Sequence, residues 1–192
     1  MLQDLVIKNR SYRRFFQEEC LDLDIIKKLV NYGRLASSAA NLQPLRYVIV
    51  NNPETNEKVF TTLRWAGYLK NWDGPLEGEK PSAYLIMLGD REYPKFHQFD
   101  GGLAAQSILL GAVEEGLGGC IFASCDREKL QDDLQIPTAY EIIVVIALGK
   151  PKERVVIDEI RAGEKIEYWR DENEIHHVPK RKLDDVIIKI YQ

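Results

Sequence analysis

Short, almost continuously apolar runs that alternate with helical patterns constrain the fold more than any other feature of this sequence. Each apolar run is typical of a buried strand. These runs cover Arg46–Val50, Ala83–Leu88, Gly119–Ala123 and Glu141–Leu148. The helical patterns cover Asp22–Gly33, Glu54 to about Leu69, Asp100–Glu115 and Asp126–Leu134. This alternation predicts an α/β or α+β sandwich.

The segment Asp100–Glu115, DGGLAAQSILLGAVEE, is small or apolar on nearly every side. A helix of this kind is buried, either in a large core or against another subunit. A chain of 192 residues makes one domain with little room for a fully internal helix. An oligomer interface is therefore a fair inference beside plain core packing. The C-terminal part is polar apart from Leu183–Ile190, and suits wrapping over another surface.

Composition excludes several classes of protein. The net charge is −4, and the basic residues are spread along the chain, whereas a nucleic-acid-binding protein gathers a basic excess on one face. The longest apolar run, Ile142–Leu148, is far below the roughly 18 residues of a membrane span. No signal-peptide pattern opens the chain. Three cysteines without a framework spacing suit a reducing compartment, so we expect a cytoplasmic protein.

Familiar catalytic motifs are absent. The sequence has no G-x-S-x-G elbow, H-E-x-x-H pair or P-loop. Gly116–Gly119 fails as a dinucleotide fingerprint, because Ile121 occupies the third glycine position and the segment leads from helix to strand. His176 and His177 are adjacent and cannot face one metal from regular structure. We therefore expect neither a Rossmann nicotinamide site nor a metal site.

Three polar segments are hard to explain by packing. Arg10–Phe15 carries three guanidinium groups and a hydroxyl, which can bind phosphate or the polar edge of a ring. Ser37–Pro44 combines small residues with hydrogen-bonding side chains and would let a ligand lie close to the backbone. Val178–Leu183 is a basic run after a proline. Taken singly, each is also explained as a solvated turn, loop or charge run.

Together, these segments resemble the nitroreductase family. Arg10–Phe15 resembles its opening R-S-x-R-x-F signature, and Ser37–Pro44 its P-S-x-x-N-x-Q-P motif. Asp100 onward is similar to its long central helix and G-L-G turn. The remaining similar pieces are Ile136-Pro137, Ala147–Pro151 and Pro179–Leu183. The resemblance covers nearly the whole chain.

The resemblance implies an α+β fold, an α/β/α sandwich with a mainly antiparallel sheet, in one domain over residues 1–192. It also implies an intertwined homodimer with two FMN molecules at the interface. The central helix would pack on its mate, and the tail from about residue 160 to 192 would wrap the partner. This would account for both the all-round apolar helix and the polar tail.

The resemblance also assigns residues to the cofactor. The phosphate would be held by Arg10 and Ser11, with Lys180 and Lys182 helping. Arg13 would lie at the N1 and O2 edge of the ring, where a cation favours reduction. The other subunit would contribute Ser37, Ser38 and Asn41. The backbone around Ile121, Phe122 and Ala123 would approach N5.

The implied reaction is ping-pong: NADH or NADPH delivers hydride, and an electron-poor acceptor of nitroaromatic or quinone type removes it. Because the cofactor carries the chemistry, no dedicated catalytic acid or base is expected. Reductive dehalogenation, flavin destruction and a non-catalytic FMN-binding sensor are the alternatives, and a weaker one is that no cofactor binds. Trp65–Pro81 is a candidate lid, although core packing explains Trp65 and Tyr68 equally well.

Overall fold

The computed structural model describes residues 1–192. The chain forms two compact units. The larger unit contains residues 1–64 and 75–152, and the smaller contains residues 65–74 and 153–192. No helix combines the length and hydropathy that a membrane span requires.

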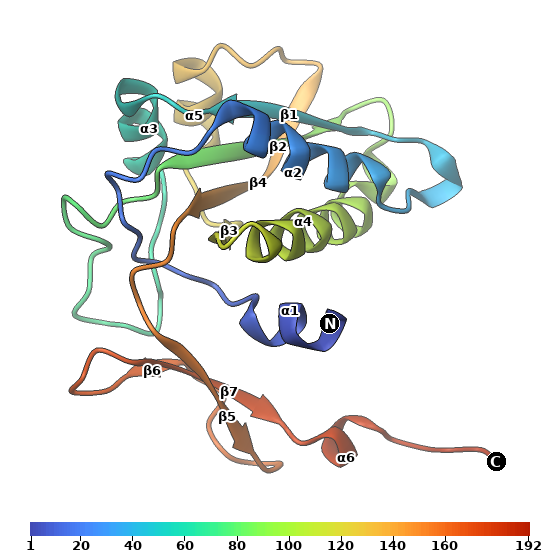
Figure 1. The fold of residues 1–192 in the computed structure, drawn as a ribbon. Helices are drawn as coiled ribbons and strands as arrows, with labels where there is room; N and C mark the ends of the chain where they lie inside the picture. Colours follow the sequence, from blue (N-terminus) through green and yellow to red (C-terminus); the bar gives the residue numbers. More distant parts are fainter. The chain divides into compact units, whose positions relative to one another are not determined.

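A four-stranded sheet forms the centre of the larger unit (Figure 1). Its strands are β1 (Leu45–Val50), β2 (Ala83–Asp90), β4 (Tyr140–Gly149) and β3 (Gly118–Phe122), in that order, and every pair is antiparallel. Nearly every residue of β2 is buried, so both faces of the sheet are covered. The predicted α+β class and antiparallel sheet are confirmed.

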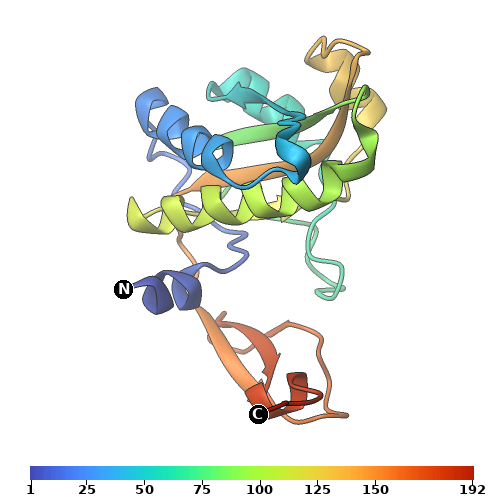
Figure 2. The ribbon, with the colours of Figure 1, turned by 90° about the vertical axis from the view of Figure 1, so that its right-hand side faces the viewer.

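Two helices, α2 (Leu23–Leu35) and α4 (His97–Glu114), run side by side over one face of this sheet (Figure 2). Helix α2 begins where Asp22 accepts a hydrogen bond from the Asp24 amide, as an N-cap does. The two helices approach closely because a Cβ at Gly111 would collide with the Tyr32 ring. Their shared core with the sheet includes Ile26, Leu29, Leu85, Met87, Ile108, Ile146 and Leu148.

The remaining helices of the larger unit are short. They are α1 (Leu2–Lys8), α3 (Pro53–Phe60), α5 (Arg127–Asp133) and two single 3-10 turns, η1 (Ala39–Asn41) and η2 (Pro94–Phe96). The prediction of a helix from Glu54 to about Leu69 is wrong in length. The helix ends at Phe60, and the chain then turns. Leu63 forms a β-bridge with Cys125, so the apolar residues after Phe60 do not continue the helix.

The smaller unit is built on a second sheet that sequence patterning did not predict. Its order is β5 (Val155–Ile160), β7 (His176–Arg181) and β6 (Trp169–Arg170), and β5 pairs with β7 in parallel. Residues 65–74 belong to this unit: the Tyr68 and Tyr168 rings lie 4.9 Å apart, and the Arg170 guanidinium lies 4.7 Å from the Trp72 ring. After α6 (Leu183–Val186) the chain ends in an exposed segment.

Candidate functional site

The arginine-rich segment runs beside β3. Ser11 forms a parallel bridge with Gly119, and the Tyr12 amide donates to the Gly119 carbonyl over 3.0 Å. The segment is anchored by Phe15, which is fully buried. The structure therefore brings Arg10, Ser11 and Arg13 to the strand that leads to Ile121, Phe122 and Ala123.

Each arginine of this segment is held differently. The Arg10 guanidinium donates from Nη2 to the Val6 carbonyl over 2.8 Å, but its Nε is buried without a hydrogen-bond partner. Burial lowers the pKa of Arg10 from its ordinary value. Arg13 is 8% exposed and donates to the Ser11 carbonyl, whereas Arg14 pairs with Glu79. The orphaned donor on Arg10, beside the exposed Ser11 hydroxyl, fits an anion such as a phosphate.

The end of β3 presents backbone. Ile121 and Ala123 are exposed, whereas the Phe122 side chain is buried and leaves only its main chain available. Arg127 fixes this backbone: its Nη2 donates to the Ala123 carbonyl over 2.8 Å and its Nε to the Ile142 carbonyl over 3.0 Å. Sequence reasoning missed Arg127, which looks like an ordinary residue in the first turn of a helix.

A pocket of about 400 Å³ opens beside Ile121 and Ala123. Its wall on α4 includes Gly101 and Gly102, and a Cβ at Gly102 would meet nothing within 4 Å. Small residues of this kind let a flat ring lie close to a helix. The pocket is therefore a candidate site for part of a planar ligand.

The serine loop is clasped to the start of α4. Asp100, 2% exposed, accepts from the Ser38 hydroxyl over 2.6 Å and from the Ala39 amide over 3.0 Å. The Ser38 hydroxyl in turn accepts from the Gln43 amide over 2.9 Å. Ser38 is thus engaged within its own chain, whereas Ser37 and Asn41 are exposed. No sequence pattern indicated that Asp100 holds this loop.

Backbone strain concentrates in the same loop. Ala40, Asn41 and Gln43 have φ values of 49°, 54° and 49°. This left-handed conformation is uncommon for residues other than glycine, although asparagine tolerates it. Strain that the surrounding structure maintains is frequent at ligand sites, which supports the loop as a functional element.

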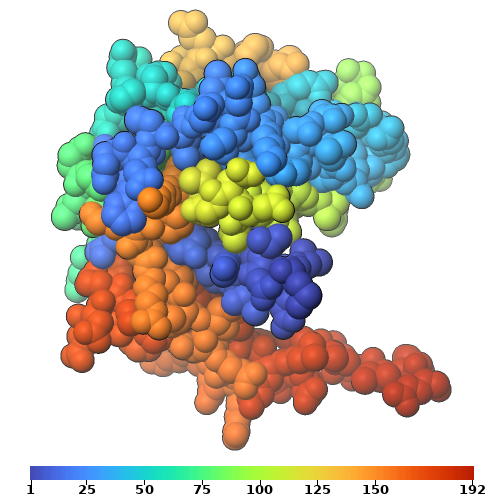
Figure 3. All heavy atoms as spheres, viewed as in Figure 1, coloured from blue at the N-terminus to red at the C-terminus, as the bar shows by residue number.

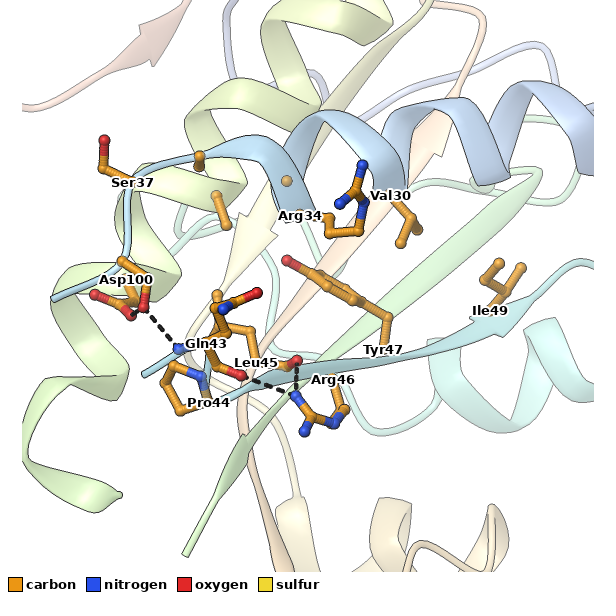
Figure 4. A pocket seen from close by; sticks show the side chains of 14 residues that line it. Val30, Arg34, Ser37, Gln43, Pro44, Leu45, Arg46, Tyr47, Ile49 and Asp100 are labelled. Atoms are coloured by element: carbon orange, nitrogen blue, oxygen red, sulfur yellow. Dashed lines mark hydrogen bonds between the residues drawn. The ribbon is translucent and has the colours of Figure 1, made fainter. Parts of the chain in front are cut away.

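Figure 4 shows a second pocket, of about 370 Å³, between this loop, α2, α4 and β1. Its lining is mainly apolar and includes Val30, Leu45 and Ile49. The Tyr47 hydroxyl is buried there without a partner, and burial raises the pKa of Tyr47 to about 12. Ser37 and Ser38 also line this pocket, and the Ser37 hydroxyl points away from the Tyr47 side chain in this view.

The serine loop and the arginine segment lie at different positions along α4. The loop is attached at Asp100, whereas Gly119, the neighbour of Ser11, lies against Leu109. Nine helical residues separate these two points, which is roughly 13 Å along the axis. One chain therefore does not bring Ser37, Ser38 and Asn41 onto Arg10 and Ser11.

The two expected lysines belong to the smaller unit. Lys180 is exposed on β7. Lys182 follows the strand, and its Nζ lies 3.1 Å from Glu159 Oε1. An anion at Lys182 would compete with this ion pair.

Comparisons with known proteins identify relatives of this chain. The chain is 27% identical over 170 residues to an iodotyrosine deiodinase from Thermotoga neapolitana, covering 80% of this chain and 90% of the relative. It is also 27% identical over 157 residues to a protein from Archaeoglobus fulgidus named as an NADH dehydrogenase/NAD(P)H nitroreductase, covering 78% and 84% of the two chains.

Solved structures share the fold. An FMN-dependent nitroreductase from Clostridium difficile R20291 superposes with a TM-score of 0.63 at 22% identity. The superposition covers 78% of this chain and 87% of that chain. The sequence model of the nitroreductase family matches residues 6–150 of this chain. That match includes the arginine segment, the serine loop, α4 and the end of β3, and the chain belongs to the nitroreductase family.

Proposed function

We propose that the protein is an FMN-dependent oxidoreductase that transfers hydride from NADH or NADPH to an electron-poor acceptor of nitroaromatic or quinone type. Family membership supports the oxidoreductase class, and a structural neighbour is an FMN-dependent nitroreductase. The observation that carries the proposal is the alignment of Arg10, Ser11 and Arg13 with β3.

The residues of this segment fit the parts of FMN. The phosphate would satisfy the orphaned Nε of Arg10 and accept from the exposed Ser11 hydroxyl. Arg13, held almost without solvent contact, would place a fixed positive charge at the edge of the ring. Lys180 and Lys182 stay predicted phosphate contacts.

Bound FMN would supply the hydride chemistry, taking hydride from the nicotinamide and passing it to the acceptor in two separate steps. The chain's own contribution is orientation and charge. Arg13 would stabilise the negative charge that develops on the reduced ring. Arg127 would keep the backbone at Ala123 in one orientation through its bond to that carbonyl.

We also propose a homodimer built on α4. Phe99 and Leu103 on this helix are 73% and 51% exposed, and part of α4 stays visible at the surface between α2 and α1 (Figure 3). If two copies pack α4 antiparallel about a two-fold axis, the start of one helix meets the later part of the other. The serine loop of one subunit would then approach the arginine segment of its partner.

Other open surfaces support the same assembly. Strand β1 is an edge of its sheet, and the apolar pocket beside it is uncovered. In the C-terminal tail, Val186, Ile188 and Ile190 are at least half exposed. Exposed edges and apolar patches are normally covered by a partner, and a tail that wraps a second copy would cover them.

Reductive dehalogenation is the second candidate, because the relative from Thermotoga neapolitana is an iodotyrosine deiodinase. A turnover assay separates the two. Flavin-loaded protein is supplied with NADPH and, in turn, a nitroaromatic, a quinone and iodotyrosine. The proposal predicts parallel double-reciprocal lines with a nitroaromatic or quinone. Turnover of iodotyrosine alone would favour the second candidate, and no turnover with any acceptor would favour the sensor.

A further inference from the structure

A histidine–glutamate pair lies at the pocket beside Ile121 and Ala123, apart from the residues assigned above. His97 opens α4 and is 2% exposed, and its Nδ1 lies 2.8 Å from Glu141 Oε1 on β4. The neighbouring strand makes room for the ring, because a Cβ at Gly89 would collide with the His97 imidazole. The fold therefore holds this imidazole in one place over β2 and β4.

Only one side of the pair opens to solvent. His97 Nε2 is buried without a hydrogen-bond partner, whereas the Glu141 side chain is 41% exposed. Both residues line the pocket that Ile121 and Ala123 also line. A proton on His97 Nδ1 therefore has a hydrogen-bonded route to the pocket, and that route passes through the Glu141 carboxylate.

The other charged groups nearby have partners of their own. Arg91 Nη1 lies 3.6 Å from Glu141 Oε2. Arg127 lines the pocket and donates to main-chain carbonyls. Asp100, one turn further along α4, is held by Ser38 and Ala39. Among the residues that line the pocket, His97 and Glu141 form an imidazole–carboxylate hydrogen bond.

Hydride transfer alone does not complete the reduction of a quinone. A quinone that receives hydride becomes a hydroquinone anion, and one proton is needed to form the neutral hydroquinone. We propose that Glu141 donates this proton and that His97 is the positioning residue that replenishes it. This inference rests on the proposed function and adds a proton donor that no sequence motif indicated.

The step balances. The N–H bond at His97 Nδ1 breaks as the Glu141 carboxylate takes that proton, and the Glu141 O–H bond breaks as an O–H bond forms on the hydroquinone anion. The pair is left as neutral imidazole and carboxylate, and the acceptor becomes neutral. A hydronium ion or buffer acid then returns one proton to the pair through the exposed Glu141 side chain.

The test compares two acceptors. Flavin-loaded protein is reduced without oxygen and mixed rapidly with p-benzoquinone, which needs a proton, or with ferricyanide, which takes electrons without one. Glu141→Gln keeps the size of the side chain but removes its acidity. The matched control, Glu128→Gln, changes an exposed glutamate on α5 outside this pocket.

The expected result is selective. Glu141→Gln slows reoxidation by p-benzoquinone about 100-fold, within the range for general acids, and removes its dependence on pH. Its reoxidation by ferricyanide stays unchanged, and Glu128→Gln leaves both rates unchanged. His97→Asn, which keeps a donor towards Glu141, slows the quinone reaction at high pH more than at low pH, because water must then replace the imidazole as the proton source.

A second readout needs no flavin. The chain has three histidines, His97, His176 and His177, so imidazole NMR signals of flavin-free protein can be followed individually against pH. We expect Glu141→Gln to move the titration of His97 and leave the other two in place. Titrations that stay identical would show that the two side chains are not coupled and would overturn the relay.

Failure of the relay and failure of the proposed function are distinguishable. Quinone and ferricyanide rates that fall together in Glu141→Gln would indicate a structural role, and rates that both stay unchanged would remove Glu141 from the reaction; either overturns the relay alone. If the protein binds no flavin, the proposed function and the relay are both overturned. The same holds if neither NADH nor NADPH reduces the bound flavin.

Discussion

For Arg10 and Arg13, the residue type and its clustering predict a binding role, but the environment of each side chain is known only from the structure. The clustering of guanidinium groups marks an anion or ring-edge site, because few other environments use several at once. The structure adds that Arg10 keeps an orphaned Nε and that Arg13 is nearly buried. The roles of Asp100 and Arg127 could not be predicted, since Ser38, the partner of Asp100, and Ile142 and Ile143, two of the partners of Arg127, are far away in sequence.

Arg13→Ala tests the charge at the ring edge. Loss of a charged hydrogen bond of about 1.5–3 kcal/mol should lower the two-electron flavin potential by about 30–60 mV. Dye-equilibrated redox titration measures it, and Arg13→Lys should restore part of the loss by returning the charge. A potential equal to that of the unmodified protein would place Arg13 away from the ring.

Arg10→Ala tests the phosphate site. Removing a charged donor of about 1.5–3 kcal/mol should weaken FMN binding by about 10- to 150-fold. Titration of FMN fluorescence measures the affinity, and riboflavin, which lacks the phosphate, serves as the control ligand. If FMN and riboflavin lose affinity equally, the residue supports the fold of the segment and does not bind phosphate.

Elements with continuous apolar patterns were predictable. The strands β1, β2, β3 and β4 lie within one or two residues of their predicted bounds, and Asp22 caps α2 as expected. The sheet of the smaller unit could not be predicted, because polar residues interrupt β7 and β6 is only two residues long. The length of α3 was overestimated because the apolar residues after Phe60 pack in other elements.

Helix α4 has a buried side and an exposed side. Its middle residue Ile108 is fully buried, near Gly33 of α2, so it cannot be part of a surface that a partner contacts. A charge placed at Ile108 would test the core. The exposed Leu103 is the appropriate position for testing a dimer.

Leu103→Asp should therefore separate the subunits without unfolding them. Light scattering after gel filtration should show a monomer, while the far-ultraviolet circular dichroism stays native. Ile108→Asp should unfold the protein instead, because an unpaired charge in a core is strongly unfavourable. A Leu103→Asp variant of unchanged mass would put the interface on another surface.

The two units of the molecule can be followed by different spectroscopic signals. All three tryptophans, Trp65, Trp72 and Trp169, belong to the smaller unit. Tryptophan fluorescence therefore reports on that unit, while circular dichroism is dominated by the helices of the larger one. The expectation of a single domain stays a prediction, and these probes can show how far the two units unfold together.

Arg170→Met tests what holds the smaller unit together. The Arg170 and Glu153 side chains are 8% and 1% exposed and lie 3.2 Å apart. Removing one partner of a buried ion pair costs about 3–5 kcal/mol, so the tryptophan signal should change at lower urea concentration than in the unmodified protein. If the urea midpoint does not move, the pair contributes little to this unit.

The proposed function requires this chain to bind FMN and to accept hydride from a nicotinamide. The most direct test is the visible absorption spectrum of FMN-reconstituted protein, recorded without oxygen before and after addition of NADH or NADPH. We expect flavin bands that bleach on addition of at least one of the two donors. Bands that persist with both donors would contradict the hydride step, and the absence of protein-bound flavin would contradict the site itself.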